Sequence, residues 1–162
     1  MRIIGIDPGT LVCGWGVIDA AGSKMKAVAW GAIRVKDEMT FPERLVCVHE
    51  GLAEVLKAHR PDAAAVEKLY LGKSFRSVMT TGEGRGIAIL TAALAKLPVH
   101  EYTPAEVKKS VVGVGGAHKP QVQEMVRVIL SLSEIPRPQD AADALAVAIC
   151  HCQRATSPIP RR

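Results

Sequence analysis

The sequence has no long hydrophobic run. The longest uncharged stretch with helical character, Gly86–Ala95, is far shorter than the roughly 18–20 residues that a membrane-spanning helix needs. Near the N-terminus, the apolar run Ile3–Ile6 ends at Asp7, which is too short for a secretory signal. We therefore expect a cytoplasmic protein that makes no contact with a membrane.

Cysteine is also scarce. The four cysteines (Cys13, Cys47, Cys150 and Cys152) have neither zinc-site nor redox-motif spacing, as is typical of a reducing cytosol. His151 lies between two of them, but adjacent ligands on a helix point to different faces, so we interpret this run as the end of a helix. The five histidines show no ligand spacing and are predicted to be structural or exposed.

The length and composition fit one folded domain. The chain has 162 residues, of which 48% are hydrophobic and 23% charged. We predict one domain over residues 1–156 and a disordered basic tail at 157–162. With 21 basic and 16 acidic side chains the net charge is +5, which is typical of proteins that bind a polyanion such as nucleic acid, although a basic surface also serves solubility.

Apolar spacing and turn signals predict an α/β fold. Strands are expected at 2–7, 14–19, 27–35, 63–67 and 98–102, and helices at 42–59, 77–96, 120–132 and 138–152, with a short helix after the capping box at 103–106. The helix at 77–96 carries Ile87, Leu90, Thr91 and Leu94 on one face. Short turns pair the first three strands antiparallel, and helical crossovers pair the others parallel. The expected result is a mixed sheet with helices on both faces.

Two of these strands end in a carboxylate, Asp7 and Glu67. The carboxyl ends of strands are where α/β sheets bind ligands. Taken separately, Asp7-Pro8-Gly9 is also a good turn, and a glutamate at a strand end is often only solvated. Two acidic strand ends together favour a functional site.

A second pair of acids, Asp140 and Asp143, has the i, i+3 spacing that places both on one face near the start of the last predicted helix. Acids in a first turn also stabilise a helix by roughly 0.3–1 kcal/mol each. Their mutual repulsion would be relieved by a divalent cation, and Mg²⁺ prefers oxygen ligands. With Asp7 and Glu67 they predict a catalytic, metal-binding site for phosphodiester cleavage, where paired ions lie about 3.5–4 Å apart.

Aromatic residues are rare, at 4% of the chain, yet two follow Glu67 closely. Tyr70 and Phe75 alternate there with the cations Lys73 and Arg76. Aromatic side chains stack on unpaired bases and cations hold phosphates, so we predict that these four residues bind DNA. The alternative is that the aromatic rings fold back onto the core.

Lys119 begins a predicted helix, where the dipole disfavours a cation, and follows the glycine-rich residues 113–116. We predict that it contacts substrate or stabilises charge in the transition state. Lys108 lies late on its helix, where a cation is favoured in any case. The segment Gly82–Gly86, which contains Arg85, has neither Rossmann nor P-loop spacing and is predicted to pack against a neighbour or a second subunit.

Several motifs together resemble the RuvC family of Holliday-junction resolvases. In chain order they are Ile4-Gly5-Ile6-Asp7-Pro8-Gly9-Thr10, Val66-Glu67, Gly84-Arg85-Gly86, Val107-Lys108, Val111-Val112-Gly113, Lys119, Val122-Gln123 and Asp140-Ala141-Ala142-Asp143-Ala144-Leu145-Ala146. The resemblance spans nearly the whole chain in the family's order.

The resemblance implies a ribonuclease H-like fold with a five-stranded mixed sheet. It also implies a homodimer that binds a four-way DNA junction and nicks two opposed strands symmetrically in recombination and repair. The four acids would bind Mg²⁺, two ions in each site, with Mn²⁺ as a substitute. Lys108 and Lys119 would lie near the scissile phosphate, Arg85 would contact DNA, and Tyr70 would stack at the junction. A branch-migration motor of the RuvA and RuvB type would be a partner.

Departures from the family pattern fall beside these residues. Lys68 and Glu83 stand where glutamine is usual, and Tyr70 adds a hydroxyl to a position that is often phenylalanine. These changes bear on sequence preference at the cut and leave the carboxylates intact.

Three other hypotheses compete. ATP-binding proteins of the actin, Hsp70 and sugar-kinase type share a similar phosphate loop, but they need two such lobes. A YqgF-type nuclease of ribosomal RNA processing would share the fold. A junction-binding protein without catalysis is disfavoured by the presence of all four acids.

Overall fold

The computed structural model describes the backbone of residues 1–68 and 75–156 and the side chains of 1–68 and 82–155. In chain order the described elements are β1 (Arg2–Asp7), β2 (Val12–Ala21), β3 (Lys24–Arg34), α1 (Phe41–His59), β4 (Ala63–Glu67), α2 (Phe75–Leu94), β5 (Val99–Tyr102), α3 (Pro104–Val112), α4 (Lys119–Ile129) and α5 (Gln139–Thr156). Every predicted strand and helix is present, with boundaries that differ by a few residues. The predicted tail at 157–162 lies outside this part of the chain.

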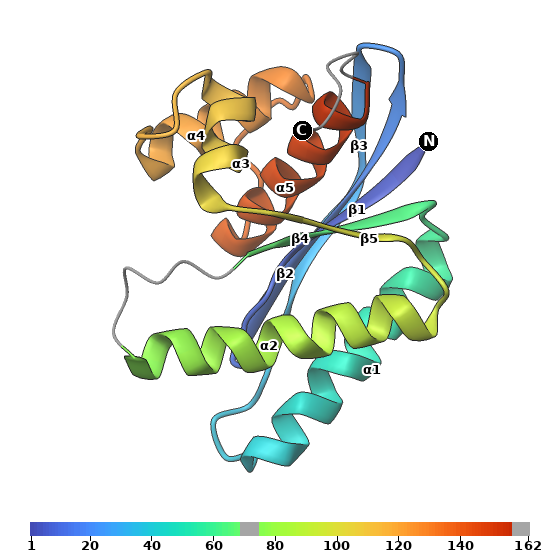
Figure 1. Ribbon diagram of the computed structural model, residues 1–162, viewed down its shortest axis with the longest axis vertical. Coiled ribbons are helices and arrows are strands. Elements are labelled where there is room, and N and C mark those ends of the chain that lie inside the picture. Colours follow the sequence, from blue (N-terminus) through green and yellow to red (C-terminus); the bar gives the residue numbers. More distant parts are fainter. Residues whose placement is uncertain (69–74, 157–162) are drawn as a thin grey trace, which may run out of the picture.

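The strands form one sheet in the order β3-β2-β1-β4-β5. The β1–β2 and β2–β3 pairs are antiparallel, whereas the β1–β4 and β4–β5 pairs are parallel. α1 and α2 cover one face, while α3, α4 and α5 cover the other (Figure 1). The predicted mixed sheet between two helical layers is therefore confirmed. No helix in the described ranges is both long and apolar enough to traverse a bilayer.

α5 is the central helix of its layer and packs against β1 and β2 (Figure 1). On its sheet-facing side the fully buried residues Ala144 and Ala148 lie against Gly5 of β1, and Leu145 lies against Gly16 of β2. Small side chains let a helix approach a sheet closely, which brings its first turn down to the strands. This packing determines where Asp140 and Asp143 lie.

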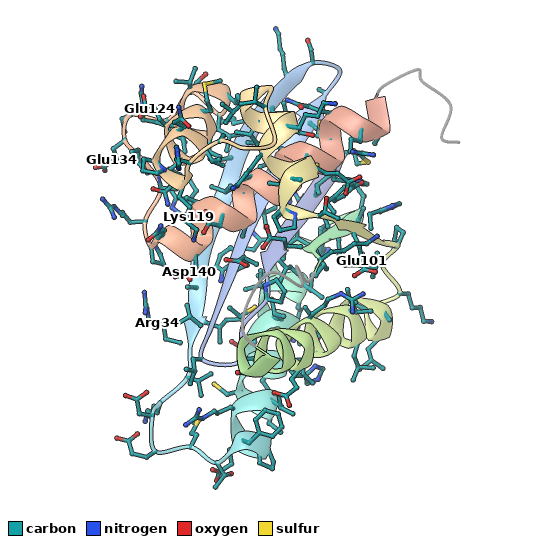
Figure 2. The ribbon with its side chains drawn as sticks, turned by 60° about the vertical axis from the view of Figure 1, so that its left-hand side comes forward. Arg34, Glu101, Lys119, Glu124, Glu134 and Asp140 are labelled. Atoms are coloured by element: carbon teal, nitrogen blue, oxygen red, sulfur yellow. The ribbon has the colours of Figure 1, made fainter. Side chains whose placement is uncertain are left out.

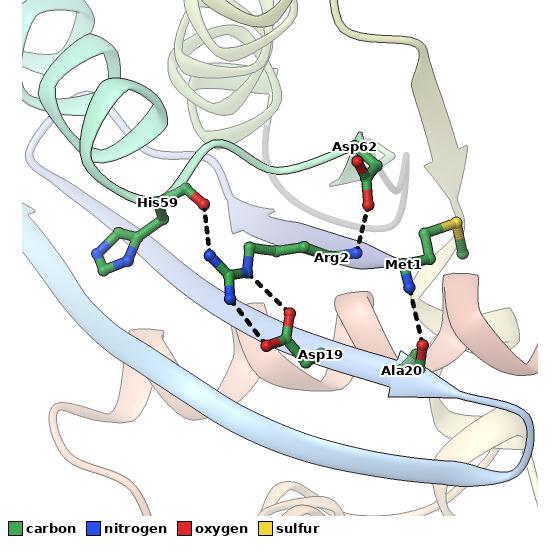
Figure 3. Close-up of polar contacts among 6 residues, drawn as sticks. All are labelled: Met1, Arg2, Asp19, Ala20, His59 and Asp62. Atoms are coloured by element: carbon green, nitrogen blue, oxygen red, sulfur yellow. Dashed lines mark hydrogen bonds and ion pairs between the residues drawn. The ribbon is translucent and has the colours of Figure 1, made fainter.

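A polar network at the amino end of β1 aligns three segments (Figure 3). The Arg2 guanidinium donates two hydrogen bonds of 2.8 Å to Asp19 on β2 and one of 2.9 Å to the carbonyl of His59 at the end of α1. The Arg2 backbone N–H donates to Asp62, directly before β4, at 2.6 Å. These bonds hold β1, β2 and β4 in register, so that β1 and β4 end level with each other at their carboxyl ends.

The predicted apolar face of α2 is divided between core and surface. Thr91 is buried, and so are Ala88 and Ala92. In contrast, Leu90 and Leu94 are 51% and 64% exposed. α2 therefore packs on the sheet through small residues and presents its two large leucines to the outside.

Candidate active site

Asp7 and Glu67 end adjacent parallel strands. Ile6 of β1 is paired with Val66 of β4, so the next residue on each strand is one of the two acids. Both side chains are only partly buried, whereas the strand residues before them are fully buried. The two carboxylates therefore lie beside each other at the carboxyl edge of the sheet, as the sequence predicts.

The first turn of α5 reaches this edge because β2 carries a glycine there. Gly14 is the β2 partner of Asp7. A Cβ on Gly14 would overlap the carbonyl oxygen of Asp140 and would lie 2.5 Å from its carbonyl carbon. Only a glycine permits this approach, which puts Asp140 across from Asp7. Gly14 was not among the residues predicted for the site, although a glycine inside a strand is itself a signal of close backbone approach.

Three of the predicted acids act electrostatically on the fourth, Asp7. Burial, which is the largest cause, and the negative charges of Glu67, Asp143 and Asp140 together raise the pKa of Asp7 to about 7. The positive charge of Lys119 acts in the opposite direction. Since such effects require proximity, residues from β1, β4 and α5 form one crowded anionic group.

Lys119 places a positively charged ammonium beside these carboxylates. It is the first residue of α4, and its Nζ donates to Oδ2 of Asp143 at 2.8 Å. Burial opposes its charge, but the hydrogen bond and charge of Asp143 outweigh that effect and raise the pKa of Lys119. Figure 2 shows Lys119 and Asp140 at the same end of α5. The ion pair offsets the unfavourable position of a lysine at a helix start.

The donor chemistry of this group suits a hard divalent cation. All four acidic side chains offer carboxylate oxygens, which are the ligands that Mg²⁺ and Mn²⁺ prefer. Among the residues that the structure describes, no three carboxylate, imidazole or thiolate groups are close enough to surround one ion. Cation binding by these four residues would therefore require their carboxylates to move closer together.

The other predicted DNA contacts are placed only in part. Lys108 is partly buried on α3 and forms no ion pair with a described residue. Arg85 on α2 donates through Nε to Oε1 of Glu101 on β5 at 2.6 Å, a partner that the sequence pattern did not indicate. Tyr70 and Lys73 lie outside the described residues, as do the side chains of Phe75 and Arg76.

The cysteine and histidine residues of α5 are structural. His151 is 3% exposed, and its Nδ1 lies 2.7 Å from the hydroxyl of Tyr102. Cys150 and Cys152 are buried free thiols. The interpretation of this run as a helix end was wrong by one turn, because α5 continues to Thr156. The prediction that this histidine is structural is confirmed.

Comparison with known proteins decides the family. A family model described as "Crossover junction endodeoxyribonuclease RuvC" matches residues 3–151. The chain belongs to the RuvC family. Within it, this chain is 49% identical to the RuvC protein of Chloroflexus aurantiacus over 155 residues, which covers 96% of this chain and 94% of that one. The RuvC protein of Brevibacillus brevis is 46% identical over 94% of this chain and 92% of its own length.

Solved RuvC structures share this fold. Thermus thermophilus RuvC in complex with a Holliday junction substrate superposes with a TM-score of 0.90 at 35% identity, covering 96% of this chain and 95% of that one. The yeast mitochondrial Holliday junction resolvase has a TM-score of 0.66 at 13% identity over 93% of this chain and 77% of that one, which supports the fold alone. The ribonuclease H-like sheet implied by the sequence resemblance is thus confirmed.

Proposed function

We propose that this protein is a crossover junction endodeoxyribonuclease that resolves four-way DNA junctions by nicking two opposed strands symmetrically. The observation that carries the proposal is the convergence of Asp7, Glu67, Asp140 and Asp143, from three separate elements, on one edge of the sheet. Their mutual effect on the pKa of Asp7 supports a shared cation site. The RuvC family supports a four-way DNA junction as the substrate.

The four carboxylates would hold Mg²⁺, with two ions in each site and Mn²⁺ as a substitute. When bound, Mg²⁺ would supply Lewis acidity for the activation of the attacking water and for the charge on the leaving oxygen. The chain's own contribution is to orient the carboxylates from rigid strand and helix ends. Lys119 would exchange its contact with Asp143 for a nonbridging oxygen of the scissile phosphate and stabilise its charge. Lys108, Tyr70, Lys73, Phe75 and Arg76 remain predicted DNA contacts.

Symmetric nicking requires two active sites, and α2 offers a surface for a second copy of the chain. Leu90 and Leu94 lie one helical turn apart and are largely exposed. Beside them, a groove of about 550 Å³ between α1 and α2 is lined by residues such as His49, Ala53 and Leu97. A two-fold dimer would bury the same patch on both copies. A motor of the RuvA and RuvB type remains a further predicted partner.

The decisive experiment is the cleavage of a labelled, mobile four-way junction with and without Mg²⁺, with linear duplex and single strands as controls. Wild type should produce paired nicks at symmetric positions on the junction alone. Asp7→Asn should abolish the nicks and retain junction binding, because it removes a cation ligand and no predicted DNA contact. Asp37→Asn, an exposed aspartate on the loop before α1, is the matched control and should cleave normally.

Other outcomes would separate the alternatives. Binding to the junction without Mg²⁺-dependent nicks would leave a recognition module. Cleavage of structured RNA in place of the junction would favour a nuclease of the YqgF type. Loss of junction binding together with cleavage in Asp7→Asn would make Asp7 a structural residue.

A further inference from the structure

α2 approaches the turn that follows Asp7 closely at Gly84. Gly84 is buried, and a Cβ at this position would lie 2.9, 3.0 and 3.1 Å from the carbonyl carbon, Cα and nitrogen of Gly9. All three are backbone atoms, which cannot swing aside as the end of a side chain does. The distance between α2 and the Asp7 turn is therefore set by the absence of a side chain at residue 84.

The turn has little freedom to yield to a larger residue. A Cβ on Gly9 would overlap the carbonyl oxygen of Val12, so the chain already closes tightly on itself there. Thr10, on the same turn, is only 3% exposed. A side chain at residue 84 that displaced the Gly9 backbone would therefore also displace Asp7, two residues earlier.

The next residue of α2 makes a second anchor. The Arg85 guanidinium donates to Glu101 of β5 at 2.6 Å, and both side chains are largely covered, at 30% and 26% exposed. Figure 2 shows Glu101 on β5, above α2. Glu101 is paired across the sheet with Val66, the residue before Glu67. Arg85 thus ties α2 to the strand beside the second strand-end acid.

We propose that Gly84 and Arg85 are positioning residues for the carboxylate group. Gly84 holds α2 against the Asp7 turn, and Arg85 holds it against β5 beside Glu67. Together they keep Asp7 and Glu67 at the separation that a shared cation requires. The inference rests on the proposed function, and it names the Asp7 turn and β5 as the neighbours against which the segment 82–86 packs.

The test compares two glycine-to-alanine variants. In Gly84→Ala the new Cβ meets backbone atoms of the Asp7 turn. In the control, Gly51→Ala on α1, the three atoms nearest to the new Cβ all belong to the side chain of Ile33, at nearly the same distances of 2.9–3.1 Å. Gly84→Ala should need roughly tenfold more Mg²⁺ than wild type for half-maximal cleavage, as is typical when a metal ligand loses its supporting contacts. Its affinity for the junction in metal-free buffer should be unchanged. Gly51→Ala should match wild type in both measurements.

A second readout requires no catalysis. Mg²⁺ that binds the folded state raises the melting temperature, so titrating Mg²⁺ against the melting temperature of the DNA-free protein reports cation affinity directly. Gly84→Ala should shift this titration to higher Mg²⁺ by the same factor as cleavage. The proposal would be overturned if the Mg²⁺ titration of Gly84→Ala matched that of wild type, or if both glycine variants shifted it equally. If wild type cleaved no junction at all, the proposed function would fail, while this titration would still test the positioning.

Substitutions of Arg85 provide an independent test if Gly84→Ala does not fold. Arg85→Gln should shift the Mg²⁺ titration of the DNA-free protein, and Arg85→Lys, which can still reach Glu101 with a cation, should recover part of the shift. Weakened junction binding with a wild-type Mg²⁺ titration would instead assign Arg85 to DNA contact and contradict its positioning role.

Discussion

Lys119 and Asp143 form an ion pair across the proposed active site, with 2.8 Å between Nζ and Oδ2. The ammonium is at the start of α4, and the carboxylate is on the fifth residue of α5. The same positive charge lowers the pKa of Asp7, against the combined effect of burial and three carboxylates. Lys119 therefore helps to keep the site ionised at neutral pH, in addition to any contact with the scissile phosphate.

Replacing this lysine should shift the pH dependence of cleavage. In Lys119→Met the pKa of Asp7 rises above its value of about 7, because the charge that lowers it is gone. Only ionised Asp7 can bind a cation, so the rising limb of the pH–rate profile should move to higher pH. A shift of one pH unit would reduce cleavage roughly tenfold on the acid side and much less at pH 9.

The matched control is Lys109→Met, an exposed lysine on α3, which should keep the wild-type profile. The measurement is the single-turnover cleavage rate between pH 6 and 9 at one fixed Mg²⁺ concentration below saturation, so that protonation of Asp7 still competes with cation binding. If the cleavage rate of Lys119→Met were lower than that of wild type by the same factor at every pH, the lysine would act on the phosphate alone. Its effect on the pKa of Asp7 would then be irrelevant to the rate.

The raised pKa of Asp7 also predicts that the metal-free site destabilises the fold. An aspartate with a pKa of about 7 in the folded protein and 3.8 in the unfolded chain binds its proton more tightly when folded. Between about pH 4 and 7 the unfolded state has lost this proton and the folded state retains it, so the free energy of unfolding falls as pH rises. Above pH 7 the penalty is complete, and the shift from 3.8 to about 7 corresponds to about 4 kcal/mol.

Asp7→Asn removes this penalty while keeping the shape of the side chain. In EDTA at pH 8 the variant should be more stable than wild type by up to that amount, and the difference should shrink toward zero near pH 4. Urea unfolding at both pH values measures it, and added Mg²⁺ should stabilise wild type and not the variant. Equal stability at pH 8 would mean that Asp7 ionises without cost in the folded protein.

Periodicity and turn signals were sufficient to predict the fold, since each layer depends on local patterns. The strands Arg2–Asp7 and Ala63–Glu67 have the predicted bounds because an acid or a turn ends each apolar run. The surface of α2 was harder to predict. Thr91 is buried and Leu90 exposed, although both lie on the predicted face. Close approach of a helix to the sheet favours small residues, and the pattern of hydrophobic residues alone does not indicate which face of the helix must be small.

The acids of the candidate site could be predicted, and so could packing of the segment 82–86 against a neighbour, but the backbone contacts that hold the acids in place could not. Asp7 and Glu67 end strands, a position that the sequence reveals. Gly14 and Gly84 matter because a distant backbone lies where their Cβ atoms would be. Likewise, the pairing of Arg85 with Glu101 depends on how α2 crosses β5. Such relationships arise only when segments far apart in sequence are packed together.

The exposed leucines of α2 give the last prediction, which concerns the proposed dimer. Leu94 is 64% exposed, so Leu94→Glu should not disturb the core of the monomer, but it would place a charge in an apolar interface between two copies. The variant should have the mass of a monomer in light scattering and should lose paired nicking. Val128→Glu, at a 50% exposed valine on α4, is the matched control and should remain dimeric. A dimeric Leu94→Glu protein that still nicks both strands would place the interface elsewhere.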